Sequence, residues 1–188
     1  MRLNITDPAG MWDVVLSCVS DAEVQDREGN SGRGFTNLKR ILGHPASFAF
    51  VVDELARTVP PEHAIVGCDE GAWALAGALA LRLAAPAVLI RRVPKTYFVS
   101  YGDDPSVGDG RLVGERLPTG TPVHLIDDLI YSGRTLRSAL DALELVGLTA
   151  TSASAILWTR RAEDAVRELA ERGLQSVTCL VSQTQESG

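Results

Sequence analysis

The chain has 188 residues, 45% of them hydrophobic, and a formal net charge of −6 at pH 7. That size and composition suit one well-buried globular domain, while the acidic balance disfavours a general nucleic-acid binder, because such proteins are usually basic. The three cysteines, Cys18, Cys68 and Cys179, are widely spaced and form no CxxC pair, so neither a disulfide framework nor a zinc site is indicated. We therefore expect a cytoplasmic protein with reduced thiols. No signal peptide is expected, since residues 1–20 carry Asp7 and Asp13 and no long apolar core. No membrane span is expected either, since Arg82 and Pro86 interrupt the longest apolar stretch.

Residues 1–60 differ from the rest of the chain and are predicted to form a separate N-terminal region with a first helix. Residues 26–35 are polar and rich in glycine, which indicates a loop or hairpin that could lie over a binding site. His44 and Pro45 precede apolar residues at helical spacing, so we predict a helix with Pro45 in its first turn.

From residue 64 onward, short apolar strands alternate with helical patterns. Strands are predicted at 64–67, 87–90, 123–126, 153–158 and 176–181, and helices at 72–84, 135–146 and 162–172. This alternation predicts an α/β fold with a doubly wound parallel sheet, its core spanning residues 61–185 and the whole chain forming one compact domain. Residues 97–113 carry no periodic pattern and are predicted to form a long mobile loop.

The most informative segment is the run from residue 123 to 136. An apolar strand leads into Asp127 and Asp128, and a Tyr-Ser-Gly-Arg-Thr turn then precedes a helix. Ligands of open parallel sheets bind at the carboxyl ends of strands. Because successive strand residues point to opposite faces, both carboxylates can reach one ligand only where the strand ends. There one carboxylate can accept hydrogen bonds from ribose hydroxyls, and the other can hold a Mg²⁺ shell or a second hydroxyl.

The turn at residues 131–135 offers the groups that a phosphate needs. It supplies backbone amides, the hydroxyls of Ser132 and Thr135, and the N-terminal dipole of the following helix. An isolated Asp-Asp pair more often caps a helix after a core strand. With Ser-Gly-x-Thr behind the pair and a strand before it, a site for a sugar phosphate is favoured.

The run resembles the phosphoribosyl-diphosphate (PRPP) binding motif of type I phosphoribosyltransferases, in which an apolar strand, two acids and a Thr/Ser-Gly-x-Thr loop follow one another. The resemblance implies the type I phosphoribosyltransferase fold, with a small N-terminal hood. It implies catalytic roles at the ribose for Asp127 and Asp128, which are also the expected Mg²⁺ site, through water. It also implies that the 5′-phosphate is bound by Tyr131, Ser132, Gly133, Arg134 and Thr135.

Other segments are similar to orotate phosphoribosyltransferases. The basic residues Arg91, Arg92 and Lys95 match a segment of those enzymes that precedes the mobile loop, and fixed cations there would stabilise a leaving pyrophosphate. Family enzymes of this type are homodimers in which a loop cation reaches the partner's site, and Lys95 is the catalytic candidate for that role. Where the family has a loop His and Gly, this chain has Tyr97 and Phe98.

The family's pyrophosphate-binding turn falls at Asp69, Glu70 and Gly71. Gly71 suits a tight turn near phosphate, whereas two carboxylates are unusual beside an anion. The acids could hold Mg²⁺ or a basic residue of a partner, or they could form a plain surface turn.

A base-binding set is implied at three positions. Arg33 and Phe35 match the hood segment of the orotate enzymes, and Arg160 matches the arginine that grips the carboxylate of the base, with Thr159 in place of an Asp. Arginine gives bidentate recognition of a planar anion. Arg160 could instead pair with Glu163 at the start of the next helix.

The predicted activity is transfer of the 5-phosphoribosyl group of PRPP to a nitrogen heterocycle, most readily a pyrimidine such as orotate, with Mg²⁺ and release of pyrophosphate. Two alternatives remain open. The Tyr-Ser-Gly-Arg-Thr turn also looks like that of the pyrimidine-operon attenuation regulators, so a weakly catalytic or non-catalytic sensor of PRPP or a nucleotide is possible, although nucleic-acid binding is disfavoured by the charge. A hydrolase on the same fold, with water as acceptor, is the other alternative.

Overall fold

The computed structural model describes residues 23–25, 31–33, 38–94, 101–102, 109–158 and 162–182. The chain divides into two compact units, residues 1–51 and residues 52–188. Within the described residues, no helix is both long and apolar enough to cross a membrane.

The first unit contains a two-stranded antiparallel sheet and the beginning of a helix. Strand β1 (Glu23–Gln25) pairs with β2 (Ser31–Arg33), so the hairpin alternative for this segment is the one observed. A 3-10 helix, η1 (Leu38–Gly43), precedes α2 (Pro45–Ala56), which continues into the second unit. Pro45 stands at the first helical position, as predicted, where its missing N–H costs no hydrogen bond.

The second unit is built on a six-stranded sheet with the order β5-β4-β3-β6-β7-β8. All neighbouring pairs are parallel except β4 with the short edge strand β5. The strands are β3 (Ala64–Cys68), β4 (Ala87–Ile90), β5 (Leu112–Val113), β6 (Pro122–Ile130), β7 (Thr149–Trp158) and β8 (Ser176–Ser182). The predicted α/β fold with a doubly wound, mostly parallel sheet is confirmed.

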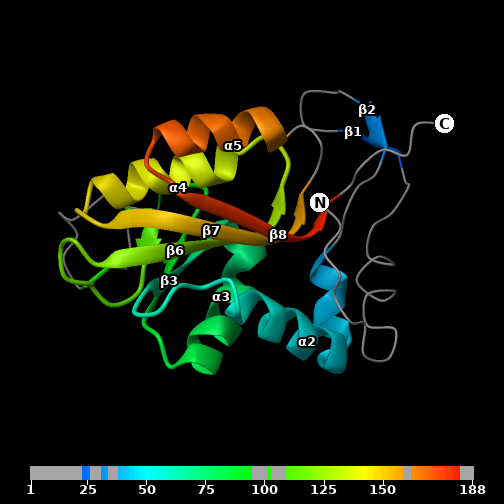
Figure 1. The fold of residues 1–188 in the computed structure, drawn as a ribbon, viewed down its shortest axis with the longest axis horizontal. Helices are drawn as coiled ribbons and strands as arrows, with labels where there is room; N and C mark the ends of the chain where they lie inside the picture. Colours follow the sequence, from blue (N-terminus) through cyan, green and yellow to red (C-terminus); the bar gives the residue numbers. More distant parts are fainter. Residues whose placement is uncertain are drawn as a thin grey trace. The chain divides into compact units, whose positions relative to one another are not determined.

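Helices cover both faces of this sheet (Figure 1). Helices α4 (Arg134–Glu144) and α5 (Ala162–Glu171) lie on one face and α3 (Asp69–Leu83) on the other. A strand covered on both sides must be apolar on both sides, and all five residues of β3 are buried. Gly67 in β3 lets α3 approach closely, because a Cβ there would lie 2.8 Å from the Cβ of Ala76.

The predicted loop over residues 97–113 contains more regular structure than its sequence indicated. Leu112 and Val113 form β5, and Tyr101 bridges to Gly114. The Tyr101 side chain is buried, and its hydroxyl accepts a 3.1 Å hydrogen bond from the backbone N–H of Leu117. The remaining loop residues, 97–100 and 103–108, lie outside the described part of the chain.

Candidate active site

The acidic pair lies where the strand order of the sheet reverses. From β3 the chain winds outward to β4, whereas β6 is followed by β7 and β8 on the other side. Pairing of β3 with β6 ends at Gly67 and Ile126, while β6 stays paired with β7 as far as Ile130. β3 and β6 therefore separate immediately before Asp127. Ligands of doubly wound sheets bind at this kind of switch point, at the carboxyl ends of the strands.

Asp127 is almost fully buried, with 3% of its surface exposed. Since side chains alternate along a strand and Asp128 lies against α3, Asp127 belongs to the face that α4 covers. Its Oδ1 accepts a 2.9 Å hydrogen bond from the backbone N–H of Asp128. Burial raises the pKa of the Asp127 carboxyl well above its ordinary value, and the negative charges of Asp128 and Asp69 raise it further. A cation or a set of hydroxyl donors placed here would relieve that unfavourable charge.

Asp128 points to the opposite side, toward the first turn of α3, and is half-buried. A Cβ on Gly71 would lie 3.1 Å from Oδ2 of Asp128, so the absence of a side chain at Gly71 makes room for this carboxylate. The two acids thus lie on opposite faces of β6, as the alternation of a strand requires, just beyond its last pairing with β3 and before the strand ends at Ile130.

The turn after β6 leads into an uncapped helix N-terminus. Gly133 adopts a left-handed conformation with φ of 68°, and no side chain caps α4. The first helical hydrogen bond runs from the N–H of Arg137 to the carbonyl of Gly133 at 2.9 Å, so the amides of residues 134–136 precede it. Ser132 and Arg134 are exposed, Tyr131 is 48% exposed and Thr135 is half-buried. Exposed amides at the positive end of a helix form a site for an anion.

The turn at Asp69 and Glu70 is the first turn of α3, and not a separate turn before the helix as the sequence suggested. Acids at this position interact favourably with the helix dipole. Asp69 has φ of 68° and forms an ion pair with Arg92, whose Nε lies 2.8 Å from Oδ2 of Asp69. The basic partner of Asp69 is therefore a residue of its own chain.

The ionisation of these two acids is linked. Burial alone would raise the pKa of Asp69, but hydrogen bonds from Glu70 and the contact with Arg92 outweigh it and lower that pKa. The hydrogen bond to Asp69 raises the pKa of Glu70, and burial adds to that rise. In the residue that follows β4, Nη1 of Arg91 is buried and has no hydrogen-bond partner among the described residues. An unsatisfied guanidinium nitrogen at the end of β4 is a group that a bound anion would satisfy.

Arg111, which the sequence did not single out, contacts both the segment after β4, at Arg91, and helix α4, at Ser138. Arg111 has only 13% of its side chain exposed, and its Nε contacts Oδ2 of Asp109 at 2.5 Å. Its Nη1 donates to the carbonyl and to Oγ of Ser138 in α4, at 3.0 and 2.6 Å. No sequence signal marks it, because Arg111 stands in a polar segment without periodicity.

The structure does not describe several of the predicted site residues. Lys95, Phe35 and Arg160 lie outside the described residues, as do Tyr97, Phe98 and Thr159, and Arg33 is described only through the backbone of β2. The residues that the structure does bring together are Asp127, Asp128, Asp69 and Gly71, with the turn at 131–135 starting directly after β6.

The donor set fits a Mg²⁺ ion that is held mainly by its substrate. Among the described residues, no three His, Cys, Asp or Glu side chains gather into a metal cage. Mg²⁺ commonly uses one or two carboxylates together with waters and substrate phosphates. Asp127 and Asp128 could supply those carboxylates, and the raised pKa of Asp127 indicates a place where a cation is favourable.

The family model described as "Phosphoribosyl transferase domain" matches residues 38–178. Orotate phosphoribosyltransferase of Methanopyrus kandleri is 28% identical over 149 residues, covering 79% of this chain and 74% of that protein. Adenine phosphoribosyltransferase of Agrobacterium fabrum is 30% identical over 129 residues, covering 65% and 72%.

The fold is likewise similar to that of orotate phosphoribosyltransferase from Aeropyrum pernix. The TM-score is 0.68 at 20% identity, with 92% of this chain and 93% of that chain covered. With the family match over most of its length, the acidic pair at the switch point and the uncapped helix behind it, this chain belongs to the type I phosphoribosyltransferase family.

Proposed function

We propose that this phosphoribosyltransferase transfers the 5-phosphoribosyl group of PRPP to a ring nitrogen of a pyrimidine such as orotate and releases pyrophosphate. The position of Asp127 and Asp128 carries the proposal: they lie just beyond the last pairing of β6 with β3, and the N-terminus of α4, which no side chain caps, follows β6. This arrangement can hold a ribose by its hydroxyls and its 5′-phosphate at one time.

In the proposed reaction the bond from C1 of the ribose to the pyrophosphate oxygen breaks, a bond from C1 to the ring nitrogen forms, and the proton of that nitrogen is released to the departing pyrophosphate or to solvent. Positive charge develops on the ribose ring and negative charge on the leaving oxygen. Asp127 and Asp128 would orient the ribose hydroxyls, while Arg91, Arg92 and Lys95 would stabilise the pyrophosphate. Mg²⁺, when bound through the acidic pair and the substrate, would neutralise part of the diphosphate charge.

The choice of a pyrimidine rests on the sequence. The basic segment at 91–95 and the position of Arg160 follow the orotate enzymes, and the relatives include orotate phosphoribosyltransferase of Methanopyrus kandleri. Because adenine phosphoribosyltransferases stand among the relatives as well, adenine is the competing base. A homodimer in a cytoplasmic setting, with Lys95 reaching the partner's site, belongs to the same proposal.

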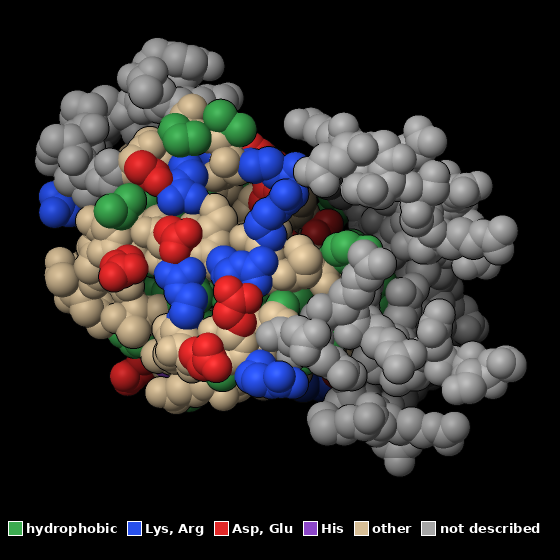
Figure 2. Space-filling model, turned by 90° about the horizontal axis from the view of Figure 1, so that it is seen from above, with side chains coloured by type: hydrophobic (Ala, Val, Ile, Leu, Met, Phe, Trp, Pro, Cys, Tyr) green, Lys and Arg blue, Asp and Glu red, His purple; other side chains and the backbone are tan. Residues whose placement is uncertain are grey.

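The alternative function is a weakly catalytic or non-catalytic sensor of PRPP or a nucleotide. A sensor that acted on RNA would need a basic surface, and the face formed by α4 and α5 is a place to look for one. Figure 2 shows acidic and basic side chains interspersed on this face. Arg137 forms an ion pair with Glu168, and Arg172 forms one with Asp141, both at 2.7 Å. Arginines that alternate with carboxylates do not build the continuous basic surface that RNA binding needs.

The test is an assay of pyrophosphate release from PRPP in the presence of Mg²⁺. It is run separately with orotate, uracil, cytosine, adenine and hypoxanthine, and once with no base. We expect release with orotate, and a fall of at least about 100-fold for Asp128→Asn, because a positioned charged group is lost. Asp141→Asn makes the same charge change on α4 away from the acidic pair and should retain activity. Release with adenine alone would refute the pyrimidine assignment, release without a base would indicate a hydrolase, and no release would favour the sensor.

A further inference from the structure

Arg111 makes contacts with both regions that the proposed function assigns to the two ends of PRPP. Its backbone carbonyl accepts a 2.8 Å hydrogen bond from the N–H of Arg91, at the end of β4. Its guanidinium reaches Ser138, four residues after the first residue of α4. β4 lies on one side of the strand-order reversal, and the chain enters α4 from β6 on the other side.

The guanidinium is held by groups that fix its direction. Nε contacts Asp109 at 2.5 Å, and Nη1 contacts both the carbonyl and the hydroxyl of Ser138. The Asp109 carboxylate also accepts a 3.1 Å hydrogen bond from the backbone N–H of Arg111, which closes a tight local loop. The planar guanidinium of Arg111, held in this way, fixes the distance between its own segment and α4. The ammonium of a lysine could not do so equally well, because it is a single point charge on a flexible stem.

We propose that Arg111 is a positioning residue that sets the distance between the pyrophosphate end of the site, at Arg91, and the 5′-phosphate end, at the start of α4. This inference rests on the proposed function, because it takes these two regions to bind the two ends of one substrate. Arg111 touches neither end of PRPP in this scheme and acts only through Arg91 and Ser138.

Loss of the Arg111 contacts should affect ligand binding differently from a general loss of stability. A ligand that spans two subsites gains affinity from their correct spacing, whereas a ligand that occupies one subsite does not. Loss of the tether should therefore weaken binding of PRPP much more than binding of pyrophosphate alone or ribose 5-phosphate alone.

The experiment measures binding of these three ligands by calorimetry, with Mg²⁺, to the wild-type protein and to Arg111→Met, Arg111→Lys and Arg172→Met. Arg172 is the matched control, since it also contacts an α4 carbonyl, that of Arg137, and a carboxylate, that of Asp141, but lies after α5. We expect Arg111→Met to raise the Kd of PRPP about tenfold, with changes of less than about threefold for the two half-ligands. Arg111→Lys should recover only part of the loss, and Arg172→Met should bind all three ligands as the wild type does.

Equal changes for all three ligands, or an unchanged Kd of PRPP in Arg111→Met, would overturn the positioning role. If Arg111→Met does not fold, Ser138→Ala removes only the Oγ contact and should show the same selectivity for PRPP at about two- to threefold. A wild-type protein that binds none of the three ligands would refute the proposed function itself. Failure of the proposed function can thus be distinguished from failure of the positioning role.

Discussion

Asp127 combines a functional position with an unfavourable environment. The carboxyl is buried, close to two other carboxylates, and among the described residues no cation pairs with it. Natural active sites often keep such groups at a cost in stability. The sequence predicted that both acids stand at the end of a strand, whereas β6 continues past them to Ile130 and only its pairing with β3 ends before them. The sequence could not tell that Asp127 would be buried and Asp128 accessible, because that difference depends on how α3 and α4 pack.

Replacement of Asp127 by Asn should therefore stabilise the ligand-free protein while it impairs activity. The folded-state pKa of Asp127 is raised by burial, so the wild-type protein loses stability as pH rises from the unfolded pKa, near 4, through the folded pKa. Asn is neutral at every pH, and its Oδ1 can still accept the hydrogen bond from Asp128. We expect the Tm of Asp127→Asn to exceed that of the wild type at pH 8 and the difference to shrink toward pH 4. In a chain of this size, each kcal/mol moves Tm by about 2–4 °C, which scanning calorimetry resolves. A Tm below that of the wild type throughout this range would contradict the prediction.

Among the helices and strands, long buried elements were predictable and short polar ones were not. β3 is a continuous apolar run because both of its faces are covered, β6 and β7 each contain a run of buried residues, and α4 carries its buried residues at helical spacing. β5 has only two residues and one neighbour, so its segment shows no period of its own. The start of α3 at Asp69 was also missed, because two acids followed by Gly71 resemble a turn in the sequence. In the structure Asp69 has a positive φ, which is also typical of a turn.

The junction between α4 and α5 depends on Gly133. Its φ of 68° is costly for other residues, and a Cβ would lie 2.7 Å from the Cβ of Ala165 in α5. Gly133→Ala should lower stability by about 2–4 kcal/mol, from backbone strain together with overpacking, and should weaken binding of ribose 5-phosphate by displacing the start of α4. Gly173→Ala is the control, since it also has positive φ but nothing within 4 Å of its Cβ. Denaturant unfolding and calorimetric binding would check both effects. Equal losses in the two variants would show that strain alone, and not the contact with α5, is responsible.

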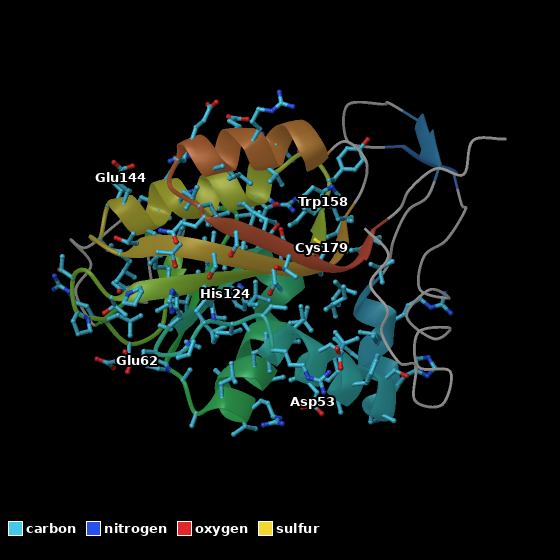
Figure 3. All side chains as sticks on the ribbon, viewed as in Figure 1. Asp53, Glu62, His124, Glu144, Trp158 and Cys179 are labelled. Carbon is cyan, nitrogen blue, oxygen red and sulfur yellow. The ribbon has the colours of Figure 1, made fainter. Side chains whose placement is uncertain are left out.

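Among the described residues, the buried polar side chains of the sheet lie in two places. One is the acidic pair at the carboxyl ends of the strands. The other is a network on the α3 side, where Nδ1 of His124 lies 2.7 Å from Oγ of Ser152 and Nε2 lies 2.8 Å from Oγ of Ser154 (Figure 3). All three side chains are buried. Serine hydroxyls can donate to one ring nitrogen and accept from the other, so the network is complete while His124 is neutral.

This network should make the protein sensitive to mild acid. Burial lowers the pKa of His124 from about 6.5 to about 4, and the charge of His63 adds to the effect. The unfolded chain then binds the proton first, so the stability that His124 contributes is complete above pH 6.5 and is lost as pH falls to about 4. The shift corresponds to about 3 kcal/mol over that window. His124→Gln, which has no titrating group, should lose correspondingly less stability between pH 6.5 and pH 4, whatever its stability at neutral pH. Urea unfolding at intervals from pH 8 to pH 4 measures the two curves, which should run parallel above pH 7 and converge or cross below pH 6. Curves that stay parallel over the whole range would show that His124 does not titrate differently in the folded protein.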